Sequence, residues 1–157
     1  MSDPNDDEPI TYVCGFVFDK EISNLILVRK LRPMYQRGKL NGIIDVMTDD
    51  DPDPISAMER VAFEKLGVPV PLWFQFNVER FEDAVTIHYF IALNDEAVQK
   101  VESLGEPDPK VHNAAEPVQV YKLSQVPYME AVPSLQYLIA MAVTKLVRIP
   151  PDHLPIL

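Results

Sequence analysis

The chain has 157 residues, of which 47% are hydrophobic and 24% are charged, and its formal net charge is −10. These proportions indicate a single soluble globular domain, large enough to bury a core without disulfide bonds. The negative charge argues against general DNA binding, because a phosphate backbone attracts basic surfaces. No run of about 18 apolar residues is present, so we expect no membrane span and no membrane partner.

The single cysteine, Cys14, lies in an apolar run and offers no disulfide framework. Residues 1–9 are acidic and lack the apolar stretch of a signal peptide, and we expect them to be disordered. These two features are typical of a cytoplasmic protein. We expect one domain over residues 10–147 and a proline-rich tail over 148–157 that cannot be helical.

Runs of β-branched and aromatic residues predict strands, and apolar residues at helical spacing predict helices. In chain order, the patterns predict strands over 10–19, 24–31 and 42–47, a helix over 54–66, strands over 72–81 and 84–93, a helix over 95–104, a strand over 118–123 and a helix over 134–147. The first two strands are expected to form a hairpin, and the two around Glu82 and Asp83 are expected to pair. Mixed strands with helices before and after them indicate an α/β (α+β) sandwich.

The first helix has strong boundary signals. Asp53 can accept hydrogen bonds from the free amides at the helix start, Pro54 suits the first helical position, and Gly67 is the expected stop. The helix has an apolar face and a separate face that carries Val61, Glu64 and Lys65. The predicted apolar face consists of Ile55, Met58, Ala62 and Leu66.

Residues 36–73 resemble the Nudix box of nucleoside-diphosphate-linked pyrophosphohydrolases. The family pattern ends in Arg-Glu-hydrophobic-any-Glu-Glu-any-Gly-hydrophobic, and RVAFEKLGV (60–68) matches it at Arg60, Glu64, Gly67 and Val68. Further pieces resemble one branch of the family, rich in phage-encoded members, in order and spacing. These pieces are QRGKLNGI (36–43), the AM of SAMER (56–60), Trp73, EPV (116–118) and PSLQYLIAMAV (133–143). The resemblance implies a Nudix-like α/β/α sandwich with a mixed β-sheet.

The chain departs from the family pattern at the residues that carry the chemistry. Ile44 and Asp45 stand where the family has two glycines, and the spacing from Asp45 to Arg60 is one residue too long. Val61 and Lys65 replace two of the three helical glutamates, so that only Glu64 remains. The resemblance therefore implies a degenerate box.

By resemblance, family members cleave a pyrophosphate with Mg²⁺ or Mn²⁺ held by carboxylates and water. Here the three helical positions sum to zero formal charge, and the ammonium of Lys65 could take the place of a cation beside Glu64. We therefore expect that no cofactor is required. Val61 on this face indicates that the groove is partly filled or covers another surface.

A substitute metal site is the alternative. Asp51, Glu64 and Glu116 could hold Mg²⁺ or Mn²⁺, with Glu64 or Glu116 as the catalytic base. The plainer interpretation of the acidic run 48–53 is a solvated loop whose last aspartate caps the helix.

The segment 28–39 is basic and contains no acid. In a Nudix-like fold, this part of the chain borders the substrate groove and is expected to face the phosphates of a ligand, or else to form a charged strand edge. The basic residues concerned are Arg29, Lys30, Arg32, Arg37 and Lys39. Tyr35 is the candidate for stacking on a base, whereas Trp73 is expected to anchor the core and His88 to be a satisfied core imidazole.

Three functions remain open. The first, which we favour, is a nucleotide-binding protein with little or no pyrophosphohydrolase activity. The second is an active hydrolase with rearranged metal ligands. The third is a protein–protein interaction module, supported by Val61 and by the apolar tail, and in each case a homodimer is left open.

Overall fold

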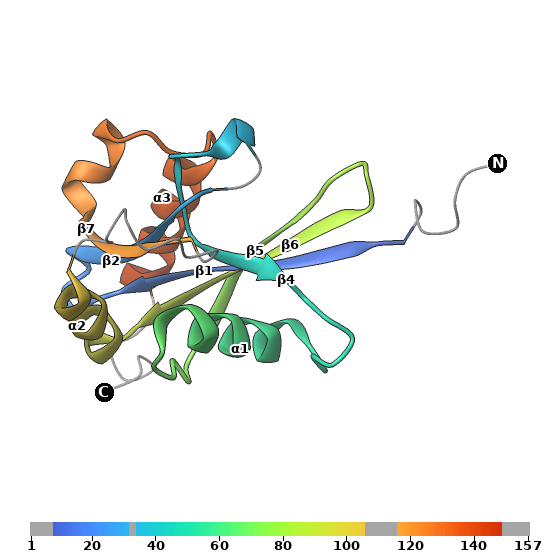
Figure 1. The fold of residues 1–157 in the computed structure, drawn as a ribbon, viewed down its shortest axis with the longest axis horizontal. Coiled ribbons are helices and arrows are strands. Elements are labelled where there is room, and N and C mark those ends of the chain that lie inside the picture. The colour runs from blue at the N-terminus through green and yellow to red at the C-terminus, as the bar shows by residue number, and fades with distance from the viewer. Residues whose placement is uncertain (1–7, 32–33, 106–115, 149–157) are drawn as a thin grey trace.

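The computed structural model describes residues 8–31, 34–105 and 116–148. Within these residues, seven strands form a mixed sheet, with α1 and α2 on one face and α3 on the other (Figure 1). In chain order the elements are β1 (Ile10–Phe18), β2 (Asn24–Arg29), η2 (Met34–Gln36), β3 (Leu40–Asn41), β4 (Ile43–Val46), α1 (Pro54–Leu66), β5 (Phe74–Arg80), β6 (Val85–Leu93), α2 (Asp95–Leu104), β7 (Val118–Lys122), η3 (Leu123–Tyr128) and α3 (Leu135–Arg148). The predicted α/β/α sandwich is confirmed. In the described ranges, no helix has both the length and the apolar character to cross a membrane.

β1 and β2 form a fork. They pair as an antiparallel hairpin near their turn, where Val17 lies opposite Ile26. Farther from the turn, β1 and β2 separate, and two short strands lie between them. β3 pairs with β2, and β4, which follows it directly, pairs with β1. Gly42 lies between these two short strands. The fork places the end of β4 beside the middle of the sheet.

β1 also pairs in parallel with β6 along its whole length. β5 pairs antiparallel with β6, as predicted, with a bulge between Gln75 and Asn77. β5 forms one edge of the described sheet, and β7 lies beyond β2 on the other side. The β5–β6 hairpin projects away from the helices (Figure 1).

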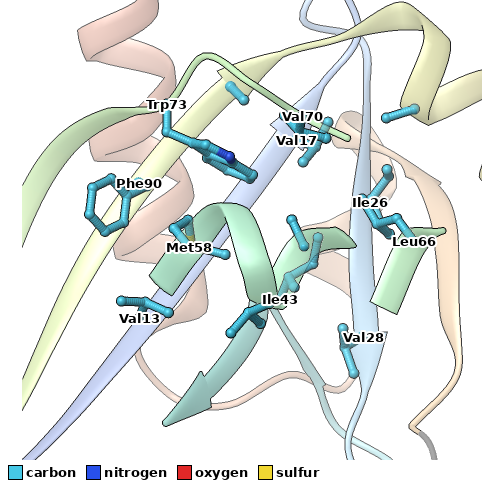
Figure 2. Close-up of a cluster of buried hydrophobic side chains, with 14 of the residues drawn as sticks. Val13, Val17, Ile26, Val28, Ile43, Met58, Leu66, Val70, Trp73 and Phe90 are labelled. Carbon is cyan, nitrogen blue, oxygen red and sulfur yellow. The ribbon is translucent and has the colours of Figure 1, made fainter. Parts of the chain in front are cut away.

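An apolar core lies on each face of the sheet. Under α1, the cluster contains Trp73, Met58 and Phe90, which Figure 2 shows together. Trp73 is 5% exposed, so its predicted role as a core anchor is confirmed. Gly15 leaves room for it, because a Cβ there would lie 2.8 Å from Cζ3 of Trp73. Packing of α1 therefore depends on a sheet position without a side chain.

The second core lies under α3. It contains Cys14, which is fully buried as predicted, and burial raises the pKa of this thiol to about 12. A thiol in this state is a small apolar side chain rather than a nucleophile. The α3 side chains that cover this core are Leu135, Leu138, Ile139, Ala142 and Leu146.

The ends of α1 lie where the sequence predicts them. The carboxylate of Asp53 accepts a hydrogen bond from the amide of Ser56 at 2.8 Å, and Gly67 has φ +75°. The predicted apolar face of this helix is partly wrong. Ile55 is 40% exposed, whereas Ala57 and Val61 are fully buried. The small side chain of Ala57 lets that arc of the helix approach the sheet.

Other expectations need smaller corrections. The strand predicted over 42–47 covers only Ile43–Val46, and the sequence analysis did not predict β3 before it. α3 continues to Arg148, one residue into the predicted tail. The Nδ1 atom of His88 is buried without a hydrogen-bond partner among the described residues, so the prediction of a satisfied imidazole is wrong. Residues 1–7 and 149–157, which make up most of the predicted disordered lead-in and of the predicted tail, lie outside the described residues, as do residues 32–33 and 106–115.

The close packing in the fork predicts that any side chain at position 42 destabilises the fold. A Cβ at this position would lie 2.7 Å from Sγ of Cys14 and 3.0 Å from the carbonyl oxygen of Gly15. Gly42→Ala should lower the free energy of unfolding by about 1–3 kcal/mol through overpacking. In a Cys14→Ala background the loss should shrink without vanishing, since the carbonyl contact remains. Urea unfolding of the four proteins measures this, and a neutral Gly42→Ala variant would contradict the geometry.

Candidate functional site

Arg60 lies at the centre of the candidate site. Its Nε and Nη2 atoms donate to the two carboxylate oxygens of Asp51, each at 2.9 Å. Its Nη1 atom lies 3.1 Å from both oxygens of Glu64, one turn farther along α1, and Nη2 also donates to the carbonyl of Val46 at 3.1 Å. Charge-assisted, two-pronged contacts of this kind are the strong ones in proteins. The guanidinium of Arg60 therefore connects the end of β4 and the following loop to α1.

Asp51 is buried, with 8% of its surface exposed. The amide and the hydroxyl of Thr48 donate to its Oδ2 atom at 2.9 Å and 3.2 Å. Hydrogen bonds from Arg60, which outweigh the opposing effect of burial, and those from Thr48 lower the pKa of Asp51 to about 2. The expectation of a solvated loop is therefore wrong for this residue. The same bonds raise the pKa of Arg60, so the pair stays ionised.

Lys65 has a different partner from the one expected. Its Nζ atom lies 3.9 Å from Oδ2 of Asp45, at the end of β4. Glu64 pairs with Arg60 instead, so the expected Glu64–Lys65 pair is not formed. Two groups of opposite charges thus join α1 to the strand and loop before it: Arg60 with Asp51 and Glu64, and Lys65 with Asp45. Cations of the protein itself lie against each of these carboxylates.

Val61 does not belong to this polar surface. It is fully buried in the core under α1, and the expectation that it partly fills a groove or covers another surface is wrong. Its arc of the helix faces the sheet, while Glu64 points outward with 52% of its side chain exposed. A carboxylate in place of Val61 would be buried without a counter-ion, which is costly.

Glu116 pairs with the residues that directly follow β2. It accepts a hydrogen bond from Nζ of Lys30 at 2.9 Å and another from the amide of Leu31. In the described ranges, no group of three His, Cys, Asp or Glu residues is placed to hold a metal ion. The predicted trio of Asp51, Glu64 and Glu116 is therefore not brought together. As arranged, these carboxylates do not fit a divalent cation, since Arg60 and Lys30 already lie against them.

The basic segment has two kinds of residue. Arg29 donates to the carbonyl of Gly38 at 2.8 Å and to the hydroxyl of Tyr121 at 3.3 Å, so it holds the loop against β7. Arg37 is exposed and Lys39 is half-buried. The expected ligand residues Arg32 and the side chain of Tyr35 lie outside what the structure describes, although the backbone of Tyr35 belongs to η2.

A polar cluster on β5 and β6 escaped the sequence analysis. Asn77 lies opposite Tyr89, and its amide is 3.5 Å from Oε1 of Glu79. Burial, followed by the nearby Cys14 and Glu79, raises the pKa of Tyr89. Two polar residues at alternate positions of a strand were the available signal.

Comparison with solved structures identifies the fold of the chain. No protein-family model matches the chain, and no curated protein matches it significantly in sequence. Among solved structures, the NUDIX domain of Shewanella oneidensis NrtR in complex with ADP ribose is similar, with a TM-score of 0.67 and 18% identity over 92% of this chain and 94% of that one. The chain has the Nudix fold.

Two other solved structures show the same likeness. Shewanella oneidensis NrtR in complex with a 27mer DNA has a TM-score of 0.68 and 17% identity over 88% of this chain, which spans 62% of that longer one. A MutT structure from work on the Aliivibrio salmonicida and Vibrio cholerae proteins has a TM-score of 0.59 and 15% identity, over 83% of this chain and 96% of that one.

The Asp51–Arg60 pair predicts an acid-dependent loss of stability. Asp51→Asn should lower the free energy of unfolding by about 1–3 kcal/mol at pH 7, since it removes charge from buried hydrogen bonds. The folded pKa of about 2 lies below the unfolded value. The contribution of Asp51 is therefore fully present above about pH 4, the unfolded pKa, and fades as the pH falls toward the folded value.

Urea unfolding at neutral pH and at several acidic values measures this effect. The difference between the wild type and Asp51→Asn should shrink on acidification. Asp50→Asn is the matched control, because Asp50 is an exposed neighbour in the same loop. A difference that stayed constant down to the lowest pH would show that the carboxylate charge of Asp51 is not what stabilises the loop.

Proposed function

We propose that this chain binds a nucleotide or a nucleoside-diphosphate derivative and cleaves its pyrophosphate linkage little or not at all. The ligand class is supported by the likeness to the NrtR domain, which was solved with ADP ribose. The lack of turnover is supported by one observation above all. The guanidinium of Arg60 already lies against two of the carboxylates near α1, those of Asp51 and Glu64.

Ligand binding on this proposal requires neither Mg²⁺ nor Mn²⁺. An arginine side chain does not lose its proton in proteins, so Arg60 keeps its positive charge over the working pH range. The ligand's phosphates must then be neutralised by side chains. Arg29 and Lys30 have internal partners. We therefore assign the phosphate contacts to Arg37 and Lys39 together with Arg32, and the base contact to Tyr35.

The alternative function, an active hydrolase with rearranged metal ligands, requires a different arrangement of these side chains. An enzyme with rearranged ligands would have to release Glu64 from Arg60, or recruit Glu116 away from Lys30, before a metal ion could bind. In that case Glu64→Gln would abolish turnover and leave the fold intact.

Absence of general DNA binding and a cytoplasmic location remain predictions of the sequence.

A ligand panel tests the proposal directly. ADP-ribose, NADH and nucleoside triphosphates are compared by thermal shift and by chromatography of the nucleoside monophosphate that pyrophosphate cleavage would form, with Mg²⁺, with Mn²⁺ and with EDTA. A ligand at about a hundred times its dissociation constant adds about 2.7 kcal/mol of stability. For a domain of this size, that should raise the melting temperature by roughly 5–10 °C. We expect the same shift in EDTA and no nucleoside monophosphate product. Robust Mg²⁺-dependent hydrolysis of any of these compounds would overturn the proposal.

The assignment of phosphate contacts predicts a charge effect. Arg37→Ala combined with Lys39→Ala should weaken binding of the best ligand by about tenfold or more, since each removes a charge-assisted contact. Lys100→Ala is the control, because Lys100 is an exposed cation on α2. Isothermal titration of the three proteins gives the affinities. Equal weakening by the control would mean that general charge, and not this segment, attracts the ligand.

A further inference from the structure

The outward face of α3 is uncovered by the rest of the described chain. Tyr137 is 76% exposed and Met141 is 40% exposed, while Ala140 and Thr144 on the same face are also exposed. The helix sequence LQYLIAMAVTKLVR contains no acidic residue. In a chain with a net charge of −10, this face is one on which two copies repel each other little.

A groove runs beside this face, between α3 and the edge strand β5. It has a volume of about 440 Å³ and is lined by Phe76 from β5 and by residues of α3. The α3 residues are Ala140, Met141, Thr144, Lys145 and Arg148. Met141, Thr144, Lys145 and Arg148 have the spacing i, i+3, i+4 and i+7, which is that of a hole that receives one side chain from a facing helix.

We propose that this face is the contact between two copies of the chain, which pack α3 against α3 in antiparallel fashion about a two-fold axis at Ala140 and Met141. Tyr137 and Thr144 lie at equal distances along the helix on either side of that axis. Antiparallel packing therefore places Tyr137 of each copy over the hole of the other. The face is thus complementary to itself, as a two-fold contact requires.

The chemistry of the contact favours this arrangement. Tyrosine buries a large apolar surface at an interface, and Ala140 at the axis lets the helices approach closely. Lys145 and Arg148 border the hole, where a cation meets the face of the incoming ring favourably. In the antiparallel pair the two helix dipoles also point in opposite directions, which is favourable.

Sedimentation velocity of the full chain, from low micromolar to several hundred micromolar, tests the proposal. The wild type should form a dimer. Tyr137→Ala should raise the dissociation constant on the order of 30-fold, as loss of an interface anchor does. Ala140→Glu sets two like charges against each other at the axis and should leave a monomer. Phe63→Ala is the control, because Phe63 is 54% exposed on α1, across the sheet from α3.

A cross-linking experiment locates the axis independently of the mass measurement. Ala140→Cys should form a disulfide between copies under mild oxidation, since disulfides need Cα atoms within about 7 Å. Glu59→Cys, at an exposed position on α1, should not. The native Cys14 does not interfere, because it is fully buried. A wild type that stays monomeric throughout, or a dimer that survives both Tyr137→Ala and Ala140→Glu without forming the Ala140→Cys disulfide, would overturn the proposal.

Discussion

The contact of one guanidinium with two carboxylates and a carbonyl organises the candidate site. Arg60 reaches Asp51, Glu64 and Val46 from a single position on α1. Asp51 can be buried because Arg60 lies against it, and burial of a carboxylate is otherwise unfavourable. The loop before α1 is thereby closed onto the helix. Arg60 thus brings a positive charge to the two carboxylates of this surface.

The fork in the sheet makes that contact geometrically possible. Gly42 allows the chain to pass from β2 to β1, and β4 then delivers Asp45 and the carbonyl of Val46 to the side of the sheet where α1 lies. Gly15 lets Met58 and Trp73 approach β1 closely. The position of the site therefore depends on Gly15 and Gly42, two residues without side chains that precede α1 in the sequence.

The sequence predicted those features that depend on neighbouring residues. Asp53, Pro54 and Gly67 act within one turn of the helix ends, so the bounds of α1 were predictable. The pairing of β5 with β6 around a short turn was predictable for the same reason. The resemblance to the Nudix box added the order of the layers, which local signals do not contain.

Contacts between distant residues were not predictable. Lys30 and Glu116 are separated by 86 positions, and nothing in either segment indicates the other. The run 48–53 offers Arg60 four aspartates, and only the folded loop brings Asp51 to it. Val61 was assigned to a polar face from its place in a family motif, whereas its burial follows from how α1 lies on the sheet. Motif position and physical environment therefore disagree at Val61, where the motif that the sequence resembles has a glutamate.

Titration of Mn²⁺ into the protein, followed by electron paramagnetic resonance of the free ion, tests the central claim most directly. With Arg60 and Lys65 supplying the positive charge, the wild type should leave micromolar Mn²⁺ free in solution. The Lys65→Glu variant, which exchanges an ammonium for a carboxylate beside Asp45, should take up more of the ion. Stoichiometric binding of micromolar Mn²⁺ by the wild type, lost in Glu64→Gln, would contradict the account.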